Sequence, residues 1–221
     1  MDKRAGLPSQ ETGPRIYYGY VVVAVALLIK VMMWGAYFAF GVFFKPLLTE
    51  FGWTRAMTSG AFSLSQIMYG SLGIIMGGLN DRFGPRIVVT LCGALFGLGY
   101  LLMSQVNTMW QFYLFYGVII GTGMSGAYVP LASTVAKWFV RRRGMMTGIL
   151  VAGSGIAALV GPPVASWLIS TYGWRTSYFI LGSIALLLVV FSAQLLGRNR
   201  TQSGQVSSGG RNEVEHEPEA E

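Results

Sequence analysis

The chain has 221 residues, of which 53% are hydrophobic and only 11% are charged. A soluble domain carries roughly a quarter charged residues, so the composition excludes an ordinary water-soluble protein and predicts the lipid bilayer as the main solvent. The formal net charge is +7. Nucleic acid is not an expected partner, because the basic residues stand at the ends of long apolar stretches and not in one patch.

Six apolar stretches are each long enough to cross a bilayer as a helix. They cover residues 17–44, 56–79, 86–103, 110–139, 145–169 and 174–196. We expect residues 1–16 to form a cytoplasmic segment before this six-helix domain, which spans residues 17–196. Residues 197–221 contain few apolar side chains and are expected to form a disordered cytoplasmic tail or linker.

The basic residues predict the orientation of the six spans. An even number of spans places both termini on one side, and loops rich in Lys and Arg stay cytoplasmic. Of the 16 Lys and Arg residues, twelve lie on the side of the termini, whereas three, Lys45, Arg55 and Arg175, lie on the other. We therefore expect a multi-pass protein of the plasma (inner) membrane with both termini in the cytoplasm.

Two turns on opposite sides of the membrane share a sequence pattern. DRFGPRIVVTLCG, from Asp81, matches STYGWRTSYFILG, from Ser170. The matched pairs are Phe83 with Tyr172, Gly84 with Gly173, Arg86 with Arg175, and Gly93 with Gly182. Inverted repeats of three helices place such turns on opposite sides. The predicted fold is therefore an all-α membrane bundle of six transmembrane helices, built as two inverted three-helix repeats.

Glycines at four-residue spacing occur in several spans. The pairs are Gly73 with Gly77, Gly117 with Gly121, and Gly144 with Gly148. Small residues at this spacing allow membrane helices to approach closely, so the pattern predicts a packed bundle.

The strongest motif is GGLNDRFGPR, from Gly77 to Arg86. Gly77 allows close helix contact, Gly84 permits a tight turn, and Pro85 suits the first position of the next helix. The motif resembles the loop motif of the major facilitator superfamily, G-x-L-a-D-r-x-G-r-k. It matches at Gly77, Leu79, Asp81, Arg82, Gly84 and Arg86. The resemblance implies a gating motif in which Asp81 pairs with a neighbouring helix end and basic groups when the inner gate is closed.

Two further features place the resemblance within the superfamily. Pro85 replaces the usual basic residue, a form that looks like the monocarboxylate and oxalate/formate antiporter branch. The segment from Tyr128 to Gly155 is similar to the fourth and fifth helices of that branch. The resemblance covers residues 17–196, one complete six-helix half, and in the family the substrate cavity lies between two such halves. It therefore implies a partner, either a second six-helix half or a second copy of the chain.

Lys30 is the candidate for binding substrate. It lies roughly 13 residues from either end of the first expected span, or about 20 Å from each interface. A charged residue at such depth is a functional candidate by default. Trp34 and Tyr37 follow at i+4 and i+7, so a cation, an indole and a phenol share one helix face that suits a carboxylate. The alternative is that Lys30 is deprotonated or hydrogen-bonded within the helix bundle.

Three more polar residues are candidates for the cavity, Gln66, Tyr128 and Ser154. Serine side chains in membrane helices often bond to their own backbone, which leaves a purely structural role open for Ser154. The resulting hypothesis is alternating-access transport of a small organic anion, similar to a monocarboxylate, with a proton as the candidate coupling ion.

The sequence does not indicate an enzyme. It has no metal-ligand cluster, no nucleotide-binding glycine loop and no catalytic triad, so neither catalysis nor a cofactor is expected. The alternative function is that of a half-length, non-transporting membrane protein that binds or regulates another transporter chain.

Overall fold

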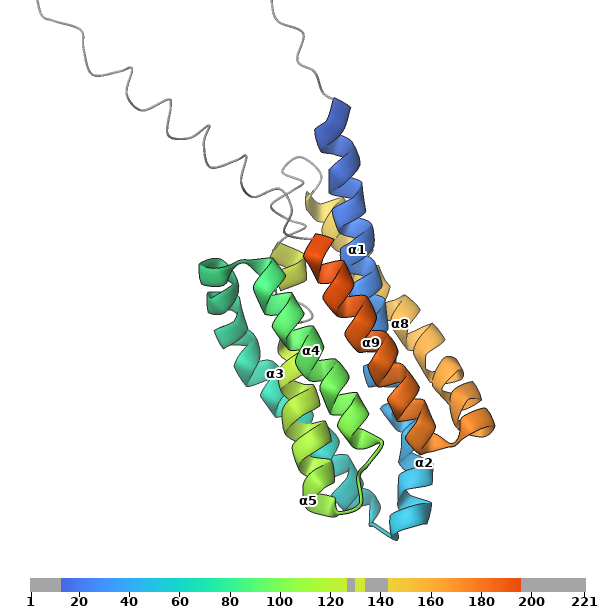
Figure 1. The fold of residues 1–221 in the computed structure, drawn as a ribbon. Helices are drawn as coiled ribbons and strands as arrows, with labels where there is room; N and C mark the ends of the chain where they lie inside the picture. Colours follow the sequence, from blue (N-terminus) through green and yellow to red (C-terminus); the bar gives the residue numbers. More distant parts are fainter. Residues whose placement is uncertain (1–12, 127–129, 134–142, 196–221) are drawn as a thin grey trace, which may run out of the picture.

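The computed structural model describes residues 13–126, 130–133 and 143–195, and these residues form helices and short connections without strands (Figure 1). The helices are α1 (Gly13–Phe38), α2 (Phe40–Phe51), α3 (Arg55–Phe83), α4 (Pro85–Met103), α5 (Met109–Phe112), the π-helix η1 (Tyr113–Ile120), α6 (Gly121–Ser125), α8 (Arg143–Tyr172) and α9 (Trp174–Leu195). Joined end to end where they are continuous, they make six helices long and apolar enough to cross a membrane. The predicted all-α, six-helix fold is confirmed, while the predicted tail and residues 1–12 lie outside the described residues.

The first span is longer than expected, and its helix is interrupted. It begins at Gly13 and reaches Phe51, with an interruption at Ala39 between α1 and α2. The hydroxyl of Tyr100, on α4, donates to the carbonyl oxygen of Ala36 at 2.7 Å. In an uninterrupted helix that carbonyl accepts from the N–H of Phe40. A side chain that enters the backbone ladder is a known cause of helix breaks.

The glycines of the two matched turns both have a positive φ. Gly84, between α3 and α4, has a φ of 85°, and Gly173, between α8 and α9, has a φ of 78°. Only glycine enters this region without strain. The turns lie at opposite ends of the bundle (Figure 1), as the inverted repeat requires.

The helix contacts also follow the inverted repeat. The third helices of the two repeats, α4 and α9, run side by side through the middle of the bundle (Figure 1). The first helix of each repeat packs on the second helix of the other: α1 packs on α8, and η1 and α6 pack on α3. Exchanging the two repeats therefore reproduces the same set of contacts, as the predicted architecture requires.

Single residues along α4 and α9 obey the same exchange. The matched turns are 89 residues apart in sequence, and the same spacing relates Gly93 to Gly182 and Tyr100 to Val189. Gly93 lies against Val189, and Gly182 lies against Tyr100. Exchanging the two repeats therefore converts the first contact into the second. This shows that residues 89 positions apart are equivalent in the two repeats.

The second helices of the repeats are the least covered. Only 6% of the residues in the most apolar stretch of α3 are buried, and 22% of those in the most apolar stretch of α8. The corresponding share in the first span is 56%.

The glycines at four-residue spacing differ in how closely they are packed. Gly121 is packed closely, since a Cβ added there would lie 2.8 Å from the carbonyl oxygen of Ser65. Gly73, Gly144 and Gly148, on α3 and α8, would meet no described atom within 4 Å. The glycine spacing thus marks a contact within the chain at Gly121 but not at these three positions.

Candidate functional site

The site is built where α1 crosses α3. The Tyr37 and Ser65 hydroxyl oxygens are 2.8 Å apart. Ser65 also donates to the carbonyl of Phe62 at 2.7 Å, so Tyr37 is the donor to Ser65. The ring of Trp34 packs edge-on against Tyr69, with centroids 5.9 Å apart. Aromatic and hydroxyl side chains from both helices therefore meet at one depth in the bundle.

The register of this crossing gives the depth of Lys30. The helices are antiparallel: Tyr37 meets Ser65, and one turn toward the chain's start Trp34 meets Tyr69. Because both helices rise equally per residue, another turn brings Lys30 level with about Gly73. The side chain of Lys30 is only 1% exposed, so the lysine lies inside the bundle near the middle of its span.

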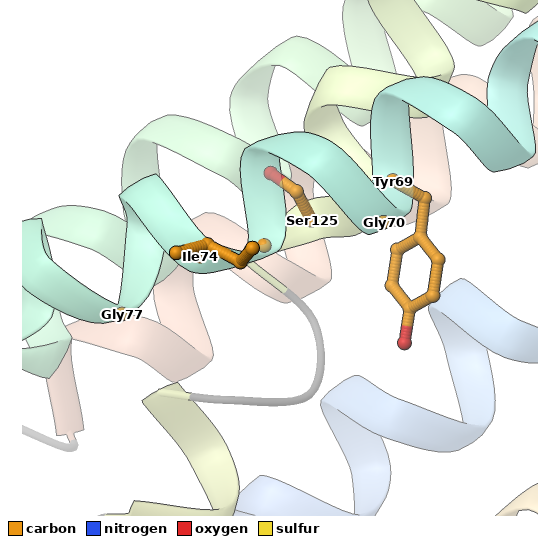
Figure 2. Close-up of a pocket in the computed structure, with 6 residues that line it drawn as sticks. Tyr69, Gly70, Ile74, Gly77 and Ser125 are labelled. Carbon is orange, nitrogen blue, oxygen red and sulfur yellow. The ribbon is translucent and has the colours of Figure 1, made fainter.

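A pocket of about 390 Å³ opens on α3 and α6 at this depth (Figure 2). Its lining residues are Tyr69, Gly70, Gly73, Ile74, Gly77 and Ser125. Figure 2 shows the Tyr69 side chain extending from α3 toward α1. The volume lies within the range of small-molecule pockets, and its walls are mostly apolar with the two hydroxyl groups of Tyr69 and Ser125.

Trp34 contributes a donor that is not used within the described residues. The indole nitrogen Nε1 is buried, and among the parts of the chain that the structure places it has no hydrogen-bond partner. The indole ring lies 6.3 Å from that of Tyr37, so the predicted shared face is present. A buried N–H without an acceptor is destabilising by about 1–3 kcal/mol, so an acceptor from outside the described residues would stabilise this site.

The other predicted cavity residues are placed differently. Gln66 is exposed on α3, next to Ser65 but on the outer side of the helix. Ser154, on α8, donates to the carbonyl of Val151 at 2.7 Å, which is the self-contained bond expected of many membrane serines. Tyr128 lies outside the described residues. The structure thus groups Trp34 and Tyr37 but does not bring Gln66 or Ser154 into their cluster.

The predicted gating motif runs from this pocket to the end of α3. Gly77 lines the pocket, and Gly84 ends the motif's helix with its positive φ. The charged residues Asp81, Arg82 and Arg86 are exposed around the turn. The motif therefore connects the pocket to the surface at the end of the bundle where α1 begins and α9 ends.

Two polar residues near the pocket are not among the predicted candidates: Tyr69, which lines it, and Asn80, which lies within the gating motif. Asn80, within the motif, is 2% exposed, and its Nδ2 donates to Ser133 Oγ at 3.0 Å, joining α3 to the end of the fourth span. Asn80 directly follows the predicted second span, which ends at residue 79, so its burial became evident only because α3 continues to Phe83. Tyr69 had no signal in the sequence, because only the crossing with α1 distinguishes it from other aromatic residues.

Comparison with known proteins agrees with this architecture. The family model described as Major Facilitator Superfamily matches residues 26–218. The chain is 31% identical to monocarboxylate transporter 1 of Homo sapiens over 211 residues, which cover 94% of this chain and 42% of that protein. It is 29% identical to monocarboxylate transporter 2 of Homo sapiens, covering 96% of this chain and 46% of the relative. It is also 29% identical to monocarboxylate transporter 13 of Bos taurus, covering 80% and 42%. The chain thus spans less than half the length of these relatives.

Proposed function

Because the chain belongs to the Major Facilitator Superfamily, we propose that it is one six-helix half of a secondary transporter that moves a small organic anion, similar to a monocarboxylate, by alternating access. The names of its relatives support this substrate class. The observations that carry the proposal are the burial of Lys30 at the depth of a pocket and the unused indole N–H of Trp34, one helical turn further along α1. The proposed membrane is the plasma membrane, with both termini cytoplasmic.

In the proposed site the carboxylate binds to the ammonium group of Lys30 and accepts from Trp34 Nε1. Tyr69 supplies a hydroxyl group, and the rings of Tyr37 and Tyr69 supply aromatic walls, while the Tyr37 hydroxyl donates to Ser65. The conformation described here covers Lys30, and alternating access changes which helices cover a central site. We propose a proton as the coupling ion, because a bound carboxylate favours the protonated amine.

The second six-helix unit is proposed to cover α3 and α8. Both helices leave most of their apolar surface uncovered in this half, and both present glycines with open space beside them, such as Gly73 and Gly148. Gln66, Ser154 and Tyr128 are proposed to complete the cavity between the two units.

The charged turn of the gating motif is proposed to close the inner side of the transporter. Asp81→Asn should leave membrane insertion unchanged, because the residue is exposed at the end of α3. It should slow uptake by the reconstituted complex, because closure of the inner gate loses a charge contact.

Binding of short monocarboxylates to the purified chain tests the anion site. We expect Lys30→Ala to weaken binding at least tenfold and Lys30→Arg to retain part of it, because the charge survives but the geometry changes. Lys45→Ala is the matched control, since Lys45 is exposed on α2 in the same span. Isothermal titration at several pH values gives the affinities. Equal affinity and equal pH dependence for wild type and Lys30→Ala would refute both the site and the proton coupling.

The second candidate is a half-length protein that binds another transporter chain without transporting. The uncovered faces of α3 and α8 favour it. Uptake of labelled monocarboxylates into proteoliposomes separates the two functions. A cysteine at Gly148, in a Cys92→Ala background treated with a mild oxidant, identifies the neighbour. A disulfide between two copies indicates a homodimer, whereas a disulfide only with a co-expressed second half that also carries a cysteine indicates a heteromeric transporter.

A further inference from the structure

A polar cluster joins three segments at the end of the bundle opposite the start of α1 and the end of α9. Glu50 lies in the last turn of α2, and Arg175 is the second residue of α9. Arg175 Nη2 lies 2.9 Å from Glu50 Oε1, and Arg175 Nε donates to the same oxygen at 3.3 Å. The indole Nε1 of Trp174 donates to the other carboxylate oxygen, Oε2. The carboxylate is therefore held through both of its oxygens by two consecutive residues.

The same arginine also reaches the connection between α4 and α5. Its Nη2 donates to Asn107 Oδ1 at 3.3 Å, and its Nη1 donates to the carbonyl of Ser104 at 3.4 Å. The guanidinium lies over the Trp174 ring at 4.6 Å. Planar guanidinium groups suit this combination of carboxylate binding and stacking. One side chain thus links the end of α2, the α4–α5 connection and the start of α9.

The inverted repeat relates this cluster to the turn at the opposite end. Arg175 is the equivalent of Arg86, and Gly173 of Gly84, in the predicted gating motif. The equivalent of Asp81 is Ser170, which carries no charge and donates to the carbonyl of its own helix at Trp167, 2.8 Å away. The second turn thus keeps the arginine of the motif but lacks its acid, and Glu50 of another helix supplies the carboxylate instead.

We propose that Glu50, Arg175, Trp174 and Asn107 form a clamp that makes α2, the α4–α5 connection and the start of α9 move as one unit. The Glu50 and Arg175 side chains are 42% and 38% exposed. An isolated exposed ion pair has little effect on stability, but here the carboxylate and the guanidinium each have several partners. The clamp goes beyond the proposed function, because it assigns a mechanical role at this end that does not depend on any anion.

Coupled substitutions test whether the clamp acts as one unit. We expect Glu50→Gln and Arg175→Gln each to lower the melting temperature of the purified chain by a few degrees, with the double variant little worse than either single one. Arg55→Gln is the control, since Arg55 is an exposed arginine at the same end, and it should leave the melting temperature unchanged. Additive effects of the two substitutions, or no effect of either, would overturn the clamp.

Hydrogen exchange tests the mechanical link in the same variants. In Arg175→Gln we expect faster exchange in all three joined segments, near residues 48–53, 104–108 and 173–177, and unchanged exchange at the Gly84 turn. An increase confined to residues 173–177 would show that the segments move independently and would contradict the proposal. This readout needs no anion, so failure of the monocarboxylate-binding experiment does not affect it.

Discussion

Gly97 on α4 lies directly against Leu186 on α9, and the two residues occupy the same position in the two inverted repeats. They are separated by 89 residues, as are Gly84 and Gly173 in the matched turns. A Cβ added to Gly97 would lie 2.6 Å from Leu186 Cβ and 2.9 Å from its Cα. A residue can contact its own equivalent only on the axis that relates the repeats, so this pair marks the pseudo-two-fold axis of the bundle.

The contact at the axis predicts that Gly97→Ala destabilises the fold. The added methyl group would collide with backbone atoms of Leu186, and overpacking of this kind costs about 1–3 kcal/mol. We expect a lower melting temperature in a fluorescence thermal-shift assay in detergent. Gly155→Ala is the control, because its Cβ would meet no described atom within 4 Å. Equal melting temperatures for Gly97→Ala and wild type would mean that α4 and α9 are farther apart than described.

Two buried tyrosines offer a matched test of the break in the first span. Tyr100 donates to the carbonyl of Ala36, whereas the hydroxyl of Tyr178 has no partner among the residues described. Tyr100→Phe should lower the free energy of unfolding by about 0.5–1.5 kcal/mol, and Tyr178→Phe should be neutral or stabilising. Reversible unfolding in mixed micelles measures both, and the opposite order of the two variants would disprove the assignment.

The hydrogen bond between Asn80 and Ser133 predicts an interaction between the second and fourth spans. Ser133→Ala should lower stability by about 0.5–2 kcal/mol, because it leaves a buried amide without its acceptor. Asn80→Leu in the same chain should recover part of the loss, since both polar partners are then removed. A double-mutant cycle measures the coupling, and a coupling energy of zero would show that the two side chains do not interact.

The orientation of the bundle is a separate prediction. Reporter fusions after Arg200 and within the loop at Arg141 should read cytoplasmic, because basic loops are retained there. A fusion between residues 105 and 108 should read external, on the side of the Glu50–Arg175 clamp. A cytoplasmic reading at residues 105–108 would invert the topology.

The sequence by itself determined the class of fold, because the information is local. Apolar stretches of bilayer length specify membrane helices wherever their partners lie, and a tight turn with glycine at a positive φ, as at Gly84 and Gly173, is encoded within a few residues. For the same reason the shared face of Trp34 and Tyr37 could be predicted, since helical spacing alone places the two side chains together.

The tertiary structure decided everything that depends on which helices meet. The sequence of the first span gives no sign of its break at Ala39, because Tyr100 of another helix binds the carbonyl of Ala36. Glu50 could not be paired with Arg175 in advance, since 125 residues separate them and the repeat pattern points to Ser170 as the position of the acid. Close glycine contacts likewise require a partner surface: Gly121 has one in α3, whereas Gly148 has no described neighbour. A contact between helices is a property of two surfaces, and a single segment encodes only one of them.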